Sequence, residues 1–321
     1  MRCLVTGGTG MIGSHLVQLL LAKRCQVAAL VREPSLAWRI ADLFPRLELI
    51  GGSLARLPEA AGAIQRFRPQ AVFHLGWYGA ASSCRNDVRH VTENLGGTLE
   101  LLHIARESGC QHFVGVGSQA EYGTHDGLLT EELPVRPTTL YGLAKLCAGL
   151  VGQQLSETLG IRFTWLRLLA AYGPADQADY LIPTVILSLL RREKPLLTSG
   201  VQRCDYLYVE DVAEAMWQAA QEPKAVGVFN LASGQPATVR AIVERLSDLI
   251  DHRLPLGWGE LPSPSHPIRS LEADISKFCR ATGWGPRIPL EEGLRRTVEW
   301  FRENQGRYAD ASRAVKGVGA S

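Results

Sequence analysis

The chain has 321 residues, of which 46% are hydrophobic and 21% charged, and its formal net charge at neutral pH is +2. A chain of this length and apolar content can bury a large core, in one large domain or in two interleaved ones. Because the charges nearly balance, no polyanion-binding surface is implied, and nucleic acid is not an expected partner.

The cysteines and the apolar stretches indicate which compartment to expect. The seven cysteines are scattered, with no Cys-x-x-Cys pair and no histidine pair at zinc spacing, so we expect no metal site and free thiols in a reducing cytoplasm. The longest apolar stretch, residues 181–190, is interrupted by Pro183 and is too short to span a bilayer, so no membrane partner is expected. A strand is predicted directly at the N-terminus, and we therefore expect no signal peptide.

Strand-like apolar runs alternate with helical patterns along the first part of the chain. Strands are predicted at residues 3–5, 27–31, 47–50, 71–75, 113–117 and 163–168, and helices at 11–21, 36–44, 59–67, 86–108 and 137–159. This alternation predicts a parallel sheet that is covered by helices on both faces. With right-handed crossovers the result is an α/β, doubly wound, Rossmann-like fold that binds its ligands at the carboxyl ends of the strands.

The regular alternation of strands and helices ends after the sixth predicted strand. A loop-rich region begins at Tyr172-Gly173-Pro174, and residues 255–267 are rich in proline, glycine and serine. The predicted organisation is a dinucleotide-binding domain over residues 1–170, to which residues 203–232 return, a smaller C-terminal substrate-binding lobe over residues 171–202 and 233–308, and a flexible tail over residues 309–321.

A glycine-rich turn joins the first predicted strand to the first predicted helix. Gly7, Gly10 and Gly13 occur there in the pattern G-x-x-G-x-x-G. Gly7 allows a turn where a side chain would clash, Gly10 lets the backbone approach a pyrophosphate, and Gly13 lets the helix pack close to the strand. The free N–H groups of the new helix then face the phosphates. A tight turn in an unrelated α/β protein would leave the same triplet, so residues further along the chain must distinguish the two.

Three polar residues further along form a candidate catalytic set. Tyr141 and Lys145 are four residues apart, on one face of a predicted helix. An ammonium near a phenol favours the phenolate, which lowers the pKa of Tyr141 toward the working pH and suits it to general acid or base catalysis. Ser118 stands at the end of the fifth predicted strand, where its hydroxyl can hold a substrate oxygen against the phenol. A Tyr-x-x-x-Lys pair alone would also suit an ordinary amphipathic helix.

With the glycine turn, the serine and the Tyr-x-x-x-Lys pair in this order, the chain resembles the extended short-chain dehydrogenases/reductases, in the NAD(P)-dependent sugar epimerase/dehydratase group. The resemblance extends from Arg2 to about Glu303. The segments that carry it are 6–13, 73–76, 94–98, 117–123, 141–145, 166–167, 172–174, 205–212, 230–231, 283–284 and 290–294.

The resemblance implies roles for the site residues. Ser118, Tyr141 and Lys145 would form the catalytic set, with Asn94 as its structural support, and Lys145 would also hold the nicotinamide ribose. The implied cofactor-binding residues are Gly7, Thr9, Gly10, Met11, Ile12, Gly13, Arg32, Ser53, Leu54, Leu75, Gly76, Trp77, Tyr141 and Lys145. The implied substrate-binding residues are Tyr78, Ser118, Gln119, Ala120, Tyr172, Arg203 and Arg269. A nucleotide sugar is the implied substrate, and the implied assembly is a homodimer formed through helices 86–108 and 138–159.

The residues after Ser118 narrow the chemistry within this group. The 4,6-dehydratases carry an Asp-Glu pair there, because water elimination needs both an acid and a base. Gln119 and Ala120 occupy these positions, and neither exchanges a proton, which removes a factor of about 10²–10⁴ in rate for each missing group. Ala120 also counts against the sugar-acid decarboxylases, which place Glu at that position. Glu121 comes one residue late and is expected to point to the opposite side.

The end of the second predicted strand bears on the cofactor. Members of the group that use NAD usually have Asp there for the ribose hydroxyls, whereas this chain has Arg32-Glu33. Arg32 is suited to a 2′-phosphate, although Glu33 could take the ribose instead. NADP is therefore the favoured cofactor and NAD the alternative. The predicted function is an NADPH-dependent 4-ketoreductase of a nucleotide-activated 4-keto-6-deoxyhexose; the alternatives are an NAD-dependent C4 epimerase of a nucleotide sugar and a non-catalytic NADP-binding sensor.

Some positions depart from the usual pattern of the group. Ser53 and Leu54 stand where an Asp usually contacts the adenine, and Cys204 stands where an Arg often binds the diphosphate. Arg203 comes one residue too early for that role, and Arg269 is a second source of positive charge.

Aromatic residues after the fourth predicted strand have two interpretations. Trp77 and Tyr78 could stack near the nicotinamide or the hexose, or they could simply pack a loop. His74, at the end of that strand, is expected to be a core histidine.

Overall fold

The computed structural model of the chain describes residues 1–79, 82–262 and 270–308. At its centre is a seven-stranded sheet in the order β12-β7-β5-β4-β1-β2-β3, and all neighbouring strands in it are parallel. This confirms the predicted α/β, Rossmann-like fold. The strands are β1 (Arg2–Thr6), β2 (Gln26–Val31), β3 (Glu48–Gly51), β4 (Ala71–His74), β5 (His112–Ser118), β7 (Arg162–Leu168) and β12 (Gly227–Leu231).

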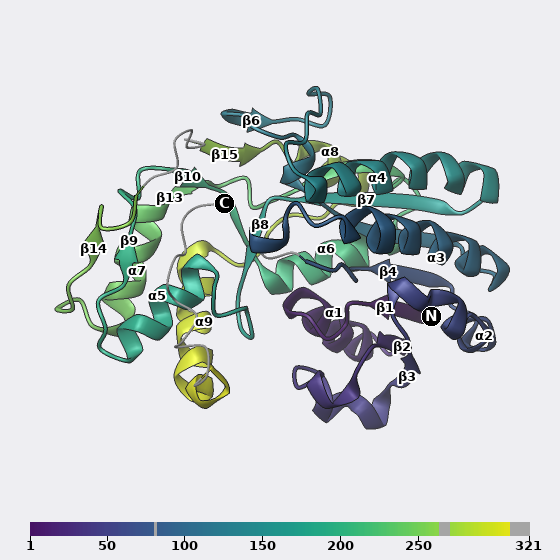
Figure 1. Cartoon of the computed structure of the whole chain (residues 1–321), viewed down its shortest axis with the longest axis horizontal. Helices are drawn as coiled ribbons and strands as arrows, with labels where there is room; N and C mark the ends of the chain where they lie inside the picture. Colours follow the sequence, from purple (N-terminus) through teal and green to yellow (C-terminus); the bar gives the residue numbers. More distant parts are fainter. Residues whose placement is uncertain (80–81, 263–269, 309–321) are drawn as a thin grey trace.

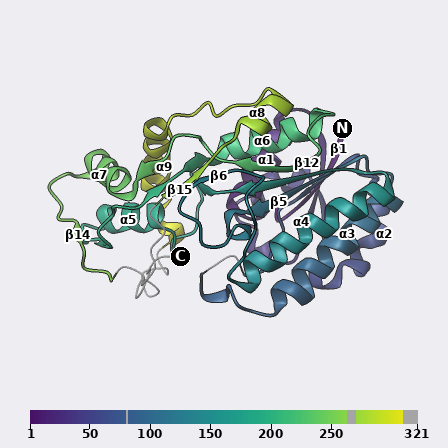
Figure 2. The ribbon, with the colours of Figure 1, turned by 90° about the horizontal axis from the view of Figure 1, so that it is seen from above.

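Helices cover both faces of this sheet (Figures 1 and 2). The strands are apolar because neither face is left to the solvent. One face shares its core with α1 (Met11–Ala22), α6 (Val209–Gln221) and α8 (Ser276–Thr282). The other face shares its core with α2 (Leu57–Phe67), α3 (Gly96–Glu107) and α4 (Leu140–Leu159). Among the helices of the described residues, none combines the length and the apolarity that crossing a membrane requires.

A second group of elements lies beside the sheet, on the left of Figure 1. Its core is formed by α5 (Leu181–Leu190), α7 (Val239–Ile250) and α9 (Leu290–Asn304), whose apolar faces pack together. Short strands form three further sheets: β8 (Ala170–Tyr172) pairs with β11 (Tyr206–Tyr208), β9 (Leu196–Leu197) pairs with β14 (Gly257–Trp258), and a four-stranded sheet has the order β13 (Ala237–Thr238), β10 (Arg203–Cys204), β15 (Ser270–Ala273), β6 (Gly127–Leu129).

Two contacts hold α9 and the segment before it to the rest of the molecule. The Oδ2 atom of Asp211, on α6, accepts hydrogen bonds from the backbone N atoms of Arg287 and Ile288 at 3.0 and 2.9 Å. The ring of Trp38, after β2, stacks on that of Trp300 with the centroids 6.3 Å apart. Helix α9 and the segment before it are therefore packed against both α6 and the segment that follows β2.

The structure corrects some of the predicted elements. No α-helix forms at residues 36–44; the chain makes two 3₁₀ turns there, η1 (Pro34–Leu36) and η2 (Ala41–Arg46), and Pro45 inside the second cannot donate a helical hydrogen bond. The helix predicted at 86–108 begins instead with a π-helical turn, η5 (His90–Leu95), which leads into α3. Helix α4 begins at Leu140, after Thr139, whose side chain accepts a hydrogen bond from the backbone of the first turn. The predicted tail, residues 309–321, lies outside the described residues.

Candidate active site

The glycine turn forms a narrow cradle at the start of α1. Gly7 has a φ of +71°, in the left-handed region that favours glycine. A Cβ atom on Gly7 would lie 2.6 Å from the backbone N of Gly76, and one on Gly13 would lie 2.1 Å from the carbonyl oxygen of Gly7. Gly10 precedes α1 without a side-chain cap, and the first turn has no acidic residue, so its N–H groups are open to an anion. These features fit the pyrophosphate of a dinucleotide.

Most of the other predicted cofactor residues lie close to this cradle or at the ends of neighbouring strands. The backbone N atoms of Leu75 and Gly76, after β4, donate to the carbonyl oxygen and to Oγ1 of Thr6 at 3.1 and 3.0 Å, which fixes them beside β1. The remaining ones are half-buried in the turn itself or at the start of the 3₁₀ turn η3 (Leu54–Arg56): Thr9, Met11, Ile12, Ser53 and Leu54.

Arg32 and Glu33 follow β2 directly and differ in what they contact. The side chain of Arg32 is exposed. The carboxylate of Glu33 accepts a hydrogen bond from the hydroxyl of Ser35 at 2.8 Å. Both residues are exposed, and they differ in that the Glu33 carboxylate already has a partner.

Ser118 ends β5 and is held by a reciprocal pair of hydrogen bonds. Its Oγ atom accepts from the backbone N of Ala120 at 3.2 Å, while its own backbone N donates to the carboxylate of Glu121 at 2.9 Å. This capping box starts the 3₁₀ turn η6 (Gln119–Glu121), in which Gln119 and Ala120 are half-buried. The orientation of the Ser118 side chain is thus set by residues adjacent to it in the chain.

Glu121 is a buried structural carboxylate. Its Oε1 atom also accepts from Nε1 of Trp165 at 2.9 Å, and its Oε2 atom pairs with Nε of Arg167 at 2.7 Å. The side chains of this ion pair are 0% and 5% exposed. Since both oxygens are engaged inside the protein, Glu121 is not a replacement for the missing dehydratase acid.

Tyr141 lies in the first turn of α4, close to Ser118. The Oγ1 atom of Thr139 caps this helix by accepting from the backbone N of Gly142 at 3.1 Å. A Cβ atom on Gly142 would lie 2.4 Å from the carbonyl oxygen of Ala120, so only glycine lets α4 approach the turn that follows Ser118. The side chain of Tyr141 is within hydrogen-bonding reach of Ser118, and that bond lowers the pKa of the phenol.

Lys145 is one helical turn further along and is almost fully buried. Its Nζ atom donates to the carbonyl oxygen of Val116 at 2.6 Å and stands 3.7 Å from the centroid of the Trp77 ring. Burial lowers the pKa of Lys145 to about 7, although the charge of Glu121 opposes this effect. Trp77 therefore packs against Lys145.

The pKa of Tyr141 differs from the prediction. The sequence predicted that Lys145 would lower it, whereas burial of the phenol raises the pKa of Tyr141 above its ordinary value. The groups that oppose this rise are the hydrogen bond from Ser118 and the positive charge of Arg85. Lys145 is directed instead to Val116 and Trp77, so the cation acting on the phenol comes from a different segment.

The π-helical turn η5 supplies two buried polar residues beneath the site. Asn94 accepts from the backbone N of Tyr78 at 2.8 Å and donates to its carbonyl oxygen at 3.0 Å, in keeping with its predicted supporting role. His90 contacts the carbonyl oxygen of Cys84 through Nε2 at 2.9 Å and accepts from the indole of Trp77 through Nδ1 at 3.2 Å. These partners imply a neutral imidazole with its proton on Nε2. The ring centroid of His90 lies 5.4 Å from that of Tyr141.

Tyr78, after β4, and His74, at the end of β4, have structural partners. The hydroxyl of Tyr78 donates to Asp87 at 3.0 Å, and the guanidinium of Arg89 lies 3.9 Å from its ring centroid. His74 is buried between Thr6 and Thr98, at 2.8 and 2.9 Å, and burial lowers its pKa to about 3. His74 is therefore the core histidine that the sequence indicated, and the side chain of Tyr78 is engaged within its own loop.

The structure does not bring the predicted substrate residues of the second group to Tyr141. Tyr172 is fully buried among α9 and its neighbours, and its hydroxyl donates to the carbonyl oxygen of Leu290 at 3.2 Å. Arg203 is exposed and pairs with Glu272 at 2.9 Å. Burial raises the pKa of the Cys204 thiol to about 12. Arg269 lies outside the described residues.

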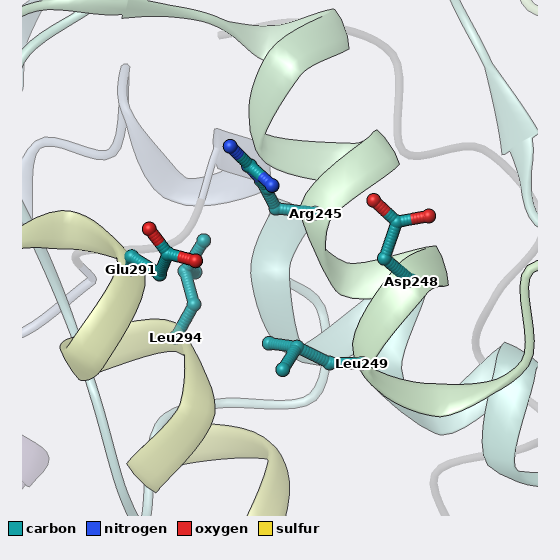
Figure 3. Close-up of a pocket in the computed structure, with 5 residues that line it drawn as sticks. All are labelled: Arg245, Asp248, Leu249, Glu291 and Leu294. Carbon is teal, nitrogen blue, oxygen red and sulfur yellow. The ribbon is translucent and has the colours of Figure 1, made fainter.

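A pocket elsewhere on the molecule is not this site. It lies between α7 and α9, where Figure 3 shows side chains from both helices converging. Its lining residues are Arg245, Asp248, Leu249, Glu291 and Leu294. None of the predicted site residues belongs to it.

Sequence reasoning missed several residues at the catalytic centre. Arg85 belongs to no predicted motif, yet its guanidinium lies 4.8 Å from the centroid of the Tyr141 ring. His90 and the Glu121–Arg167 pair were missed as well. One signal could have found the pair, because Arg167 interrupts an otherwise apolar buried strand, and a charge in such a place needs a partner.

The fold and the site together define the class of extended short-chain dehydrogenases/reductases. A sequence model described as the NAD dependent epimerase/dehydratase family matches residues 3–232. The chain belongs to this family, which confirms the resemblance seen in the sequence.

Individual relatives include epimerases and dehydratases. The chain is 30% identical over 239 residues to a UDP-glucuronate 4-epimerase from Thermodesulfobacterium geofontis, with 73% of each chain covered. It is 28% identical to dTDP-glucose 4,6-dehydratase 1 from Escherichia coli, over 95% of this chain and 93% of that one. The structure of a Thermus thermophilus UDP-glucose 4-epimerase in complex with NAD superposes with a TM-score of 0.82 at 26% identity, covering 94% of this chain and 99% of that one.

Proposed function

We propose that the protein is an NAD-dependent epimerase that inverts C4 of a nucleotide-activated hexose. The observation that carries the proposal is the placement of Tyr141 beside Ser118, with Gln119 and Ala120 following. Oxidation and reduction at one carbon need a single proton-transfer group, whereas water elimination needs a further acid and base. The site therefore fits an epimerase better than a dehydratase. The epimerases among the relatives support the same choice, and the epimerase thus takes precedence over the ketoreductase that the sequence favoured.

The residues present fit NAD as the resident cofactor. The cradle of Gly7, Gly10 and Gly13 would hold the pyrophosphate, and Lys145 would hold the nicotinamide ribose. When bound, NAD supplies a hydride acceptor and donor for the sugar carbon. NAD is the cofactor in the structure of the Thermus relative, and this supports NAD over the NADP that Arg32 favoured.

Tyr141 is the proposed proton-transfer group. As a phenolate it takes the proton of the C4 hydroxyl when C4 is oxidised. After the hexose has rotated in the site, it returns a proton, now as a phenol, to the same oxygen when C4 is reduced. Ser118 holds that oxygen against the phenol. Because burial raises the pKa of Tyr141, the phenolate needs a cation close by, and the guanidinium of Arg85 is placed to stabilise it.

Arg32 supports a second candidate, an NADPH-dependent 4-ketoreductase of a nucleotide-activated 4-keto-6-deoxyhexose. Its guanidinium is exposed after β2, while Glu33 is engaged by Ser35. A guanidinium in that position can bind a 2′-phosphate through two parallel hydrogen bonds. A reductase, unlike an epimerase, consumes reduced cofactor at every turnover and gains from the NADPH pool.

Turnover with and without added reductant distinguishes these functions. The purified protein is denatured to measure its bound NAD and NADP, and is separately incubated with UDP-glucose or UDP-glucuronate without added cofactor. The C4-inverted sugar nucleotide in excess over protein is the expected product. Stoichiometric loss of added NADPH with a 4-keto-6-deoxyhexose nucleotide, and no inversion, would establish the reductase instead. Binding without turnover of either kind would identify a sensor.

We also propose a homodimer formed through α3 and α4. The outer face of α4 exposes Leu143, Leu150 and Val151, which are 42%, 54% and 44% accessible. Apolar residues gathered on one helix face are typical of an interface. In sedimentation experiments we expect a dimer, which Leu150→Glu weakens and Val226→Glu, at an exposed valine elsewhere, does not. A monomeric parent protein would contradict this proposal.

A further inference from the structure

A cation stands against the catalytic phenol with part of its hydrogen-bonding capacity unused. The guanidinium carbon of Arg85 lies 4.8 Å from the centroid of the Tyr141 ring. Its Nε atom is buried and has no hydrogen-bond partner among the described residues. An unpaired polar group in such a place is unfavourable, so its presence beside the reacting residue points to a ligand group that completes it.

The position of Arg85 is set by the same helix that carries the phenol. The backbone N of Tyr141 donates to the carbonyl oxygen of Arg85 at 2.8 Å. The backbone N of Leu140 donates to Oδ1 of Asn86 at 3.1 Å. These bonds satisfy two N–H groups at the start of α4, which otherwise lack intrahelical partners. Arg85 is therefore held in register with Tyr141 by the backbone.

The nearby carboxylates are engaged with other cations. Asp87 pairs with Arg89 at 2.7 Å, and Glu121 pairs with Arg167 at 2.7 Å. The charges of Tyr141, Arg85 and two acids also act on the phenol of Tyr180, at the start of α5. Of these acids Asp176 is buried with its pKa raised to about 7, and Asp179 is exposed.

We propose that Arg85 binds a carboxylate on C5 of the hexose, so that the substrate is a nucleotide-activated hexuronate. The inference rests on the proposed action of Tyr141 at the C4 oxygen. In a hexopyranose C4 adjoins C3 and C5 and lies across the ring from C1, which carries the nucleotide diphosphate. The diphosphate is thus remote from a cation beside Tyr141, whereas a carboxylate on C5 is adjacent. A guanidinium recognises a carboxylate through two parallel hydrogen bonds.

Binding of a matched pair of sugars tests this role. UDP-glucuronate and UDP-glucose differ at C6 alone, and their affinities for the NAD-loaded protein are measured by calorimetry. The control variant is Arg106→Met, at an exposed residue of α3. We expect the parent and the control to bind the uronate about 10- to 100-fold more tightly than the neutral sugar, the range of a charge-assisted hydrogen bond. Arg85→Met should lose this preference, and Arg85→Lys should keep part of it.

The neutral sugar separates a specific loss from a folding defect. A misfolded variant would lose both ligands and its NAD, and in that case Arg85→Lys carries the test. Equal affinity of the parent for the two sugars would overturn the proposal, and so would an equal loss of both in a folded Arg85→Met, which would mean that Arg85 acts only through Tyr141.

C4 inversion of both sugars, measured in parallel, keeps this proposal distinct from the proposed function. A parent protein that selects the uronate through Arg85 but inverts neither sugar would refute the epimerase and support the carboxylate site. Inversion of both sugars without a preference for the uronate would support the epimerase and refute the carboxylate site.

Discussion

The glycine cradle at the start of α1 and the surroundings of Tyr141 differ in the groups that form them. At the cradle the backbone forms the site: a left-handed Gly7, a Gly13 without room for a Cβ atom, and the open N–H groups of α1. Around Tyr141, side chains from separate segments meet, with Ser118 at the end of β5, Tyr141 on α4 and Arg85 before α3. A backbone site requires glycine at a fixed spacing, whereas a side-chain site can change one residue at a time.

The departures from the group's usual pattern leave the backbone cradle untouched. Its glycine spacing is intact, whereas side-chain positions differ on the cofactor side, at Arg32 and Ser53, and after Ser118, where Gln119 and Ala120 replace the acidic pair of the dehydratases. The cradle therefore says little about the reaction, and the side chains around Tyr141 hold the information on it. Four experiments, from the largest expected effect to the smallest, test this contrast.

Tyr141→Phe removes one oxygen from the substrate side. We expect the rate of C4 inversion to fall by about 10²–10⁴-fold, because the proton-transfer group is lost while the ring is kept. The bound NAD and the melting temperature should change little. If the variant inverts sugars at the parent rate, the proposed role of Tyr141 is wrong.

Glu121→Gln tests the buried ion pair under Ser118. The amide keeps the shape of the side chain but leaves the buried charge of Arg167 uncompensated, so we expect the free energy of unfolding to fall by about 3–5 kcal/mol. The matched control is Glu272→Gln, in an exposed pair with Arg203, where the loss should stay below about 1 kcal/mol. Urea denaturation at pH 7 measures both, and similar losses in the two variants would contradict this distinction.

Gly13→Ala tests the cradle. The new Cβ atom would lie 2.1 Å from the carbonyl oxygen of Gly7, so the backbone must shift, and we expect a loss of about 1–3 kcal/mol in stability together with less retained NAD. Gly96→Ala is the control, since nothing lies within 4 Å of a Cβ atom there, and it should be neutral or slightly stabilising. Full retention of NAD by Gly13→Ala would show that the close approach is not needed.

Lys145 predicts a pH dependence of stability. Burial lowers its pKa from 10.5 to about 7, so between these values the unfolded chain binds one more proton than the folded one. The contribution of Lys145 to the free energy of unfolding therefore rises with pH across that window, by about 1.4 kcal/mol per pH unit. Below pH 7 the buried lysine is charged in the folded protein, and its desolvation lowers the stability in full. Unfolding of the parent and of Lys145→Met is compared from pH 7 to 9, where the difference in slope isolates this residue. Parallel curves would mean that the ammonium is not desolvated.

The sheet and the cradle could be predicted because their signals are local. Apolar runs such as Ala71–His74, and glycines three residues apart, specify strands and a turn within a short window. The helix expected at residues 36–44 failed for a local reason too, since proline limits the turns that can form there. The predicted start of the helix at residue 86 was wrong for a tertiary reason: residues 85 and 86 accept hydrogen bonds from α4 instead of beginning their own helix.

The site could be predicted only as a set of residues. The order of Ser118, Tyr141 and Lys145 in the chain indicated that they meet, but not which way each one points. Tyr172 and Arg203 looked like substrate residues from their motifs, yet the first is in the core and the second is paired at the surface. Side-chain partners such as Leu290 and Glu272 are distant in sequence, and no spacing rule reveals them.

By itself, then, the sequence determined the alternation of strands and helices and the glycine cradle, since each depends on residues within a few turns of one another. The proposed catalytic side chains came from the resemblance to the family. Only the tertiary structure decided that Lys145 faces Val116 and Trp77, that Arg85 is the cation beside Tyr141, and that Glu121 is bound to Arg167. The physical reason is that burial and charge act through space, between segments that the order of the chain leaves far apart.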